Sequence, residues 1–262
     1  MNNRSDAVPN PSQSSTSRRV RPVIAIDGPA GAGKSTLAAH LARRFGFLNL
    51  ETGAMYRALA LKAIENDLNF DEEQPLLDLA DYTRIRLEPQ LEGNRVFLDG
   101  ADVSRRIRDT DVTAGASRVS VHPRLRAWMV EQQRVLGALG GVVMEGRDIG
   151  TAVFPDAEVK IFLDASPEVR GDRRYRQVLT PPLSRAEEDR ISAESSNPTP
   201  EQVAAQQKIL LEMRERDERD RNRVESPLRP APDAIVLDST SLTLDQVLTE
   251  AESIVRSHLA AG

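Results

Sequence analysis

Residues 23–36 read VIAIDGPAGAGKST and decide the fold. The stretch opens with Val23–Ile26, an apolar run without alternation, which is typical of a strand buried on both faces. Residues 28–35 then match the pattern G-x-x-x-x-G-K-[ST]. Apolar residues at helical spacing follow over Leu37–Phe45. A strand, a glycine-rich turn and a helix in this order predict a phosphate-binding loop, or P-loop.

The loop has a definite chemistry. Its glycines let backbone N–H groups turn toward phosphate oxygens, and the helix N-terminus adds a favourable dipole. Lys34 can reach the β- and γ-phosphates, and the Ser35 hydroxyl can ligate Mg²⁺. The motif therefore predicts a nucleoside triphosphate and Mg²⁺ but leaves the acceptor open. The residues expected to bind the nucleotide are Gly28, Pro29, Ala30, Gly31, Ala32, Gly33, Lys34, Ser35 and Thr36.

A GTPase is disfavoured by two missing patterns. Such proteins usually carry D-x-x-G and N-K-x-D. No glycine here has an aspartate three residues before it, and no lysine follows an asparagine.

Further apolar runs recur along the chain, and helical patterns follow most of them. Ser166-Pro167 is typical of a helix start, and Thr243 with Gln246 forms a capping-box pattern. Strands that alternate with helices predict an α/β protein with a parallel sheet covered on both faces. Besides Val23–Ile26, the runs are Phe47–Leu50, Val142–Met144, Val159–Leu163 and Ala234–Leu237.

Three segments depart from this alternation. Residues 82–100 alternate around a glycine turn and predict a β-hairpin within an insertion. Residues 177–208 are polar and proline-containing, which favours a mobile excursion. Residues 1–21 lack the apolar region of a secretory signal and predict a disordered tail. We expect a tail over 1–21, a core over 22–80 and 140–262, an inserted subdomain over 81–139, and a lid over 175–213.

Composition excludes several function classes. The 262 residues carry a net charge of −5, so the whole fold is not a basic nucleic-acid binder. The absence of cysteine excludes disulfides, thiolate metal sites and thiol catalysis, and it fits a reducing compartment. No apolar run approaches the ~18 residues of a membrane span. We expect a cytoplasmic monomer that binds neither membranes nor nucleic acid.

Two constellations follow the second and third predicted strands. Glu51–Arg57 reads ETGAMYR, and Glu145–Gly150 reads EGRDIG. Both are expected at the carboxyl edge of the sheet, where open α/β folds bind ligands. The alternatives are a solvated helix face for Arg57 and an ordinary turn with a local ion pair for Arg147 and Asp148.

Arginines gather in two further places. Arg214–Arg223 reads RERDERDRNR, and Arg216, Asp220 and Arg223 share one helical face. The alternative is a solvent-exposed helix with pairs such as Glu215–Arg219, each worth ~0.2–0.5 kcal/mol. The second group precedes the mobile excursion and suits a lid that closes on polyphosphate; it consists of Arg170, Arg173 and Arg174.

These segments together resemble the bacterial cytidylate kinases. The resemblance runs from Val23 to about Val255 and is most specific in the order of EGRDIGT and RERDERDRNR. It implies a P-loop kinase core with a five-stranded parallel sheet, an inserted CMP-binding subdomain and a mobile lid. The other matching segments are IAIDGPAGAGKST, ETGAMYRALAL, GASRVSVHPRLR, VFPDAEVKIFLDAS and DAIVLDSTSLTLDQV.

The resemblance also implies roles for individual residues. Ser117, Arg126 and Asp148 would read the cytosine. Arg57, Arg147 and Arg223 would bind the α-phosphate. Asp220, oriented by Arg216, would bind the ribose, and Thr52 and Tyr56 would line the pocket. The catalytic set would be Lys34, Arg147, Arg173, Arg174 and Arg216. Thr52 replaces a frequent serine, and Glu145 replaces an aspartate before GRD.

The implied activity is phosphoryl transfer from ATP to CMP or dCMP, with Mg²⁺. Two alternatives remain at this point. The first is another small-molecule P-loop kinase, acting on UMP or on a non-nucleotide hydroxyl group. The second is a non-catalytic nucleotide-binding protein, which would not need the arginines of a second phosphate pocket.

Overall fold

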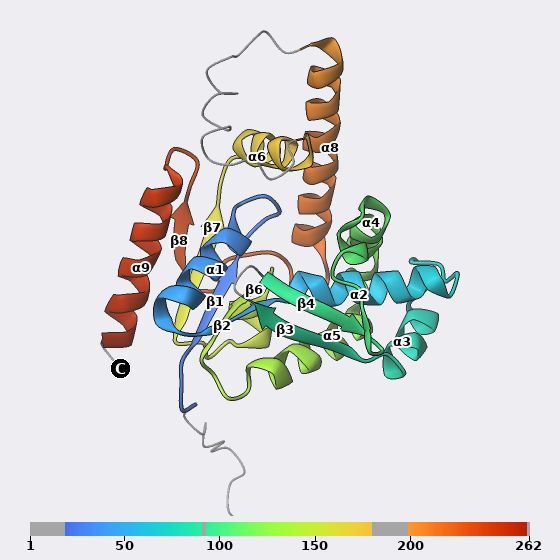
Figure 1. Ribbon diagram of the computed structural model, residues 1–262, viewed down its shortest axis with the longest axis horizontal. Helices are drawn as coiled ribbons and strands as arrows, with labels where there is room; N and C mark the ends of the chain where they lie inside the picture. The colour runs from blue at the N-terminus through green and yellow to red at the C-terminus, as the bar shows by residue number, and fades with distance from the viewer. Residues whose placement is uncertain (1–18, 91–92, 180–198, 261–262) are drawn as a thin grey trace, which may run out of the picture.

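The computed structural model describes residues 19–90, 93–179 and 199–260. Its centre is a five-stranded sheet with the order β2-β6-β1-β7-β8, and all four neighbouring pairs are parallel (Figure 1). The predicted α/β fold and its five strands are therefore confirmed. The strands are β1 (Val23–Asp27), β2 (Leu48–Glu51), β6 (Val142–Glu145), β7 (Val159–Asp164) and β8 (Ile235–Asp238).

Helices cover both faces of this sheet. Val23 and Ala25 of β1 belong to one hydrophobic cluster, and Ile24 and Ile26 belong to the other. Both sides of the strand are buried, which explains why its residues do not alternate. The helices on the Val23 face include α2 (Thr52–Glu65) and α5 (Pro123–Gly137), and those on the Ile24 face are α1 (Lys34–Phe45) and α9 (Leu244–Ala260).

The segment between β2 and β6 contains a second, antiparallel sheet. The predicted hairpin is confirmed, and a short third strand follows it. Asn94 fixes the hairpin to the core sheet: its Oδ1 accepts from Glu51 N at 2.8 Å, and its Nδ2 donates to Asn49 O at 2.7 Å. The elements are α3 (Glu73–Asp81), β3 (Ile85–Gln90), β4 (Gly93–Leu98), β5 (Ala101–Asp102), the 3₁₀ turn η1 (Arg106–Arg108) and α4 (Thr110–Val119).

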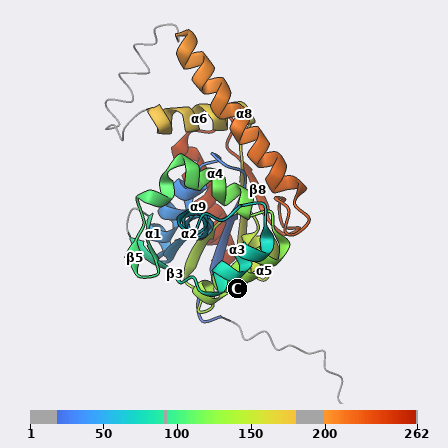
Figure 2. The ribbon, with the colours of Figure 1, turned by 90° about the vertical axis from the view of Figure 1, so that its right-hand side faces the viewer.

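Two helices, α6 (Pro167–Leu179) and α8 (Pro200–Asn222), project beyond the carboxyl edge of the sheet (Figures 1 and 2). Thr199 and Gln202 form a capping box at the start of α8, with Pro200 in its first turn. Both ends of the predicted excursion over 177–208 are therefore helical. Residues 180–198 lie outside the described residues, and the limits and mobility of the lid stay a prediction.

The chain joins the core earlier than the predicted tail of residues 1–21 allows. Arg19 donates to the carbonyl oxygen of Asp156 at 2.7 Å, and Arg21 donates to Gly46 O at 2.7 Å. These two residues belong with the core because both make contacts far along the chain. Residues 1–18 lie outside the described residues. Within the described ranges, no helix has the length and apolar character of a membrane span.

Candidate active site

The segments predicted to form the site meet at one edge of the sheet. Glu51 of β2 and Glu145 of β6 are register partners, and Ile26 of β1 is also in register with Glu145. Because all these strands are parallel, whatever follows them lies at the same carboxyl edge. The phosphate loop follows β1, α2 follows β2, the Arg147-Asp148 segment follows β6, and α6 follows β7.

The phosphate loop has the predicted geometry. Gly28, Gly31 and Gly33 all have positive φ angles, of 147°, 75° and 101°. A Cβ atom on Gly28 would lie 2.0 Å from the carbonyl oxygen of Leu163, so only glycine fits there. No side chain of the described residues caps the N-terminus of α1. Its first N–H groups can therefore serve an anion.

Lys34 begins α1 beneath this loop. Its Nζ donates to Pro29 O at 2.6 Å, and the residue is 6% exposed. Burial and then Arg147 lower the pKa of Lys34. Burial and the neighbouring Glu51 raise the pKa of Glu145, which Lys34 opposes. Phosphate oxygens placed in the loop would favour the charged form of Lys34.

A buried donor–acceptor pair lies where the resemblance places the base. Arg126 on α5 forms an ion pair with Asp148, and both side chains are buried. The Arg126 guanidinium lies 5.7 Å from the ring centroid of Tyr56 on α2. Arg126 Nε and the Tyr56 hydroxyl are buried without a hydrogen-bond partner among the described residues. This end of the site therefore presents buried polar atoms that are free to bind a ligand.

Asp220 on α8 is held by two arginines. Arg147 Nε lies 3.0 Å from Asp220 Oδ2, and Arg223 Nη1 lies 3.5 Å from Oδ1. Burial alone would raise the pKa of Asp220, but Arg147, Arg223 and Arg216 hold it below its usual value. The structure shows Asp220 hydrogen-bonded to Arg147, whereas the resemblance implied Arg216 as its orienting partner.

Positive charge converges between the phosphate loop and α8. Burial, and then Arg147, lower the pKa of Arg216 to about 10, and Arg57 and Arg174 add to this effect. These arginines come from α8, the segment after β6, α2 and α6. Within the described ranges, Nε of Arg57, Arg216 and Arg223 is buried without a partner. Such a concentration of unpaired donors suits an anionic group.

Arg57 and Thr52 lie at the start of α2, as predicted. Arg57 forms an ion pair with Glu51, so its guanidinium is already engaged on one side. Thr52 Oγ1 donates to the carbonyl oxygen of Glu145 at 2.7 Å. A Cβ atom on Gly146 would lie 2.8 Å from that hydroxyl oxygen, so the two segments approach too closely for a larger residue.

Arg170 and Arg173, two of the three α6 arginines that the sequence analysis assigned to a lid, are occupied by protein groups. Arg173 donates to Ser239 Oγ at 3.1 Å, to Ser239 O at 3.0 Å and to Ala32 O at 3.2 Å. It thus connects α6 with the phosphate loop and with the segment after β8. Arg174 affects Arg216 electrostatically and therefore lies near the cationic centre.

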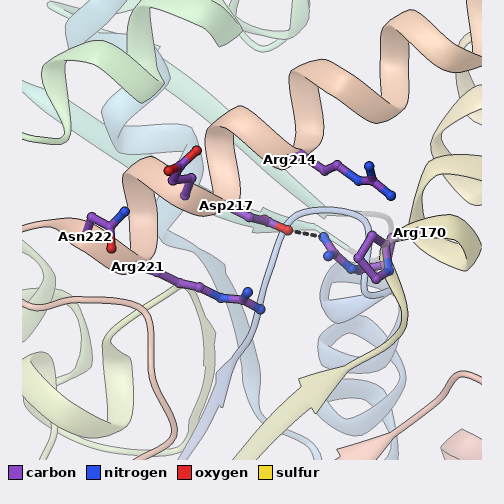
Figure 3. Close-up of a pocket in the computed structure, with 7 residues that line it drawn as sticks. Arg170, Arg214, Asp217, Arg221 and Asn222 are labelled. Atoms are coloured by element: carbon purple, nitrogen blue, oxygen red, sulfur yellow. Dashed lines mark ion pairs between the residues drawn. The ribbon is translucent and has the colours of Figure 1, made fainter.

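Arg170 is the most buried arginine of α6. It lies 2.6 Å from Asp217 of α8 (Figure 3) and donates to Ala30 O at 2.9 Å and to Ala165 O at 2.9 Å. The side chain therefore fixes α8 to the backbone of the phosphate loop. Its observed partners are protein groups, and its predicted part in a lid that closes on polyphosphate stays a prediction.

Two functional candidates were missed by the sequence analysis. Asp27 at the end of β1 accepts from Ile149 N at 2.8 Å and Gly150 N at 2.7 Å, and it fixes the π-helical turn η2 (Ile149–Val153) after Asp148. Arg219 Nη1 donates to Ser117 Oγ at 2.8 Å. Arg219 was interpreted as half of an exposed pair, because no local pattern reveals a partner on a distant helix.

A family model and the curated relatives agree on one family. The family model described as "Cytidylate kinase" matches residues 24–257. A cytidylate kinase of Solibacter usitatus is 45% identical over 245 residues, covering 94% of this chain and 97% of the relative. One of Aeromonas salmonicida is 44% identical over 230 residues, covering 88% and 92%. The solved shikimate kinase of Acinetobacter baumannii is 16% identical with a TM-score of 0.38, covering 93% and 96%.

Proposed function

Since the chain belongs to the cytidylate kinase family and is a phosphotransferase that phosphorylates CMP or dCMP with ATP as donor, we propose that the carboxyl edge of the sheet is its active site. One observation carries this assignment. Lys34 of the phosphate loop lies within electrostatic reach of Arg147 and Arg216, and Arg147 directly precedes Asp148 of the buried Arg126–Asp148 pair. A donor nucleotide and an acceptor nucleotide would bring their phosphates together at these arginines.

The base would be read by the buried pair and Ser117. Cytosine offers an N4 amino donor and the acceptors N3 and O2. Asp148 supplies an acceptor, and Arg126, which is held beside it, supplies donors. Uracil would instead point a carbonyl at the Asp148 carboxylate and leave a buried charge unpaired.

The sugar and the acceptor phosphate would be bound from α8 and the segment after β6. Asp220 would accept from the ribose hydroxyls, while Arg57, Arg147 and Arg223 would bind the α-phosphate. Thr52 and Tyr56 would line the same pocket from α2. The attacking CMP phosphate is already anionic, so the reaction requires no strong general base.

On the donor side, the phosphate loop would bind ATP and Lys34 would approach the transferred group. We propose Ser35 as the Mg²⁺ ligand. Ser35 is exposed at the start of α1. Burial raises the pKa of Glu145, a hydrogen bond from Ser35 opposes this shift, and Glu145 Oε1 lacks a partner among the described residues. Mg²⁺ usually needs only one or two oxygen ligands from the protein, because it takes its remaining ligands from substrate phosphates and water. The ion would offset charge on the β- and γ-phosphates.

Charge neutralisation and alignment would carry the in-line transfer. Lys34, Arg147, Arg174 and Arg216 would stabilise the phosphoryl group in the transition state, and Arg173 would hold the loop in place. The segment over 175–213 would act as a lid that excludes water. We also propose a cytoplasmic monomer without nucleic-acid partners, which size-exclusion chromatography with light scattering would test.

Kinetics on three acceptors test the pocket. We expect CMP to be a better substrate than UMP. Asp148→Asn offers a donor as well as an acceptor, so the CMP/UMP ratio of kcat/KM should narrow. Asp220→Ala should weaken CMP and dCMP and leave the base preference largely unchanged. A single hydrogen bond contributes ~1–3 kcal/mol when its partner is left unpaired, so both effects are measurable.

The opposite pattern would reassign the pocket. If Asp220→Ala changed the CMP/UMP ratio more than Asp148→Asn, the base and ribose roles would be exchanged. If ADP were released with UMP or a non-nucleotide alcohol as acceptor but not with CMP, the result would instead favour another small-molecule P-loop kinase.

A further inference from the structure

The contact between Arg219 and Ser117 joins two distant parts of the site. Arg219 lies on α8, half-buried, and Ser117 lies on α4 of the inserted segment, 5% exposed. The guanidinium Nη1 donates to the serine Oγ at 2.8 Å across 102 positions of sequence. We propose that Arg219 is a positioning residue for the pyrimidine acceptor: it orients the Ser117 hydroxyl and couples α8 to base recognition. This inference rests on the proposed function of the pocket.

The chemistry of the two groups supports an orienting role. A guanidinium has only donors, so it must occupy a lone pair of the Ser117 oxygen. The serine keeps its own hydrogen and a second lone pair for another partner. Without that donor, a helical serine tends to turn its hydroxyl back to the carbonyl one turn earlier in its own helix. Arg219 therefore fixes the position of the Ser117 oxygen and leaves its hydrogen available to a ligand.

The helical spacing places Arg219 with the other site residues of α8. Positions 216, 219, 220 and 223 are spaced i, i+3, i+4 and i+7, which puts them on one face of the helix. Arg216, Asp220 and Arg223 on this face are the groups assigned to the phosphate and the ribose. The Arg219–Ser117 hydrogen bond thus fixes the position of those groups on α8 relative to Ser117 on α4, which is proposed to read the base.

Arg221 provides a matched control on the same helix. It is exposed and lines a hollow of about 280 Å³ with Arg170 and Asp217, on the side of α8 that faces α6 (Figure 3). Arg221→Ala removes the same charge as Arg219→Ala two residues away. A general effect of net charge or helix propensity would therefore appear equally in both variants.

The test compares Arg219→Ala, Arg219→Lys and Arg221→Ala in steady-state kinetics with CMP, UMP and ATP. Loss of a charged hydrogen bond is expected to raise KM for CMP about tenfold in Arg219→Ala. KM for ATP should stay within twofold of wild type, and the CMP/UMP ratio of kcat/KM should fall. Arg219→Lys keeps a donor and should recover part of the loss, while Arg221→Ala should resemble wild type.

A double-variant cycle separates orientation of Ser117 from support of the fold. Ser117→Ala combined with Arg219→Ala should be no worse for CMP than Ser117→Ala alone, because the arginine acts through the serine. Losses that multiply, or an equal loss for ATP and CMP, would overturn the inference. So would an Arg219→Ala enzyme with wild-type kinetics. Failure of the wild-type enzyme to phosphorylate CMP would overturn the proposed function itself.

Discussion

Lys34 shows how the fold sets the chemistry of a single residue. Its ammonium group is buried, folded back onto Pro29 O, and surrounded by Arg147 and Arg216. Burial and then the two arginines lower the pKa of Lys34, whereas Glu145 and Asp27 oppose this shift. The loop is therefore prepared for phosphate oxygens, since binding them relieves the repulsion among the cations.

Lys34→Ala is expected to abolish measurable turnover while the fold persists. The lysine supplies charge where it accumulates in the transition state, and loss of one such donor costs about 2.7–4 kcal/mol. Coupled ADP release measures the turnover, and thermal unfolding checks the fold. Lys62→Ala is the control, because Lys62 forms an ion pair with Asp99 on the inserted segment. Near-wild-type turnover of Lys34→Ala would contradict the assignment of the loop.

Asp27 gives a pH-dependent prediction. Burial raises the pKa of Asp27 from 3.8 to about 6, although the N–H groups of Gly150 and Ile149 oppose the shift. The charged form is thus less favourable in the folded state than in the unfolded state. Stability from this group is present below about pH 4 and is lost as the pH rises through about 6.

Asp27→Asn should remove this dependence because asparagine does not titrate. The unfolding free energy of wild type, measured against Asp27→Asn by urea at several pH values, should decrease by up to about 3 kcal/mol between pH 4 and pH 7. Asparagine also offers only one acceptor to two N–H groups, so KM for CMP should rise at every pH. If the difference in unfolding free energy between wild type and Asp27→Asn did not change with pH, Asp27 would have an ordinary pKa.

At the scale of elements, α6 and α8 are fixed to the phosphate loop by one buried ion pair. Arg170 is 2% exposed and contacts Asp217 as well as the loop carbonyl of Ala30. Met213 of α8 packs against Gly31, where a Cβ atom would lie 2.7 Å from its Cε. The position of both helices is therefore linked to the conformation of the loop.

Breaking this pair should destabilise the protein strongly. Arg170→Ala leaves Asp217 buried without its cation, and such losses cost ~3–5 kcal/mol. The control is Arg214→Ala, which breaks the exposed Arg214–Glu168 pair between the same two helices and should cost under about 1 kcal/mol. Urea unfolding measures both, and KM for ATP should rise in Arg170→Ala alone. Equal losses of stability in Arg170→Ala and Arg214→Ala would show that burial of the Arg170–Asp217 pair does not set its contribution to stability.

At the scale of the whole molecule, the start of the described chain and the proposed active site lie at opposite ends of the sheet. Arg19 pairs with Asp156 and lies 5.2 Å from the Phe154 ring centroid, while Arg21 lies 5.0 Å from that of Phe47. Arg19 and Arg21 directly precede β1, so their contacts lie at the amino edge of the sheet. The active site is assigned to the carboxyl edge, so loss of the contacts at the amino edge should lower stability without changing catalysis.

Two deletions test this separation. Removal of residues 2–18 should leave the Tm nearly unchanged, because their composition predicts no packing on the core. Removal of residues 2–21 also takes Arg19 and Arg21, whose contacts each contribute ~0.5–1 kcal/mol, and should lower the Tm by about 2–6 °C. kcat and KM should match wild type in both. A several-fold loss of kcat/KM in the shorter deletion would assign a catalytic role to the tail.

The sequence by itself determined the local elements. Five apolar runs predicted five strands, the glycine pattern predicted the loop, and the capping pattern at Thr243 and Gln246 predicted the hydrogen bonds that begin α9. The order of the motifs EGRDIGT and RERDERDRNR in the sequence also indicated the cytidylate kinase family. These features depend on neighbours within about one helical turn or one strand, so short-range sterics and periodicity encode them.

The tertiary structure decided which side chains meet. Arg126 pairs with Asp148, Asp220 with Arg147, and Arg219 with Ser117, in each case between different elements. The sequence analysis assigned Arg170, Arg173 and Arg174 to a lid that closes on polyphosphate, and only the structure shows that Arg170 and Arg173 bind protein carbonyl groups. Such pairings follow from the strand order β2-β6-β1-β7-β8, which juxtaposes distant segments at one edge. These pairings depend on distances across the whole fold, and the local spacing of residue types along the chain does not determine those distances.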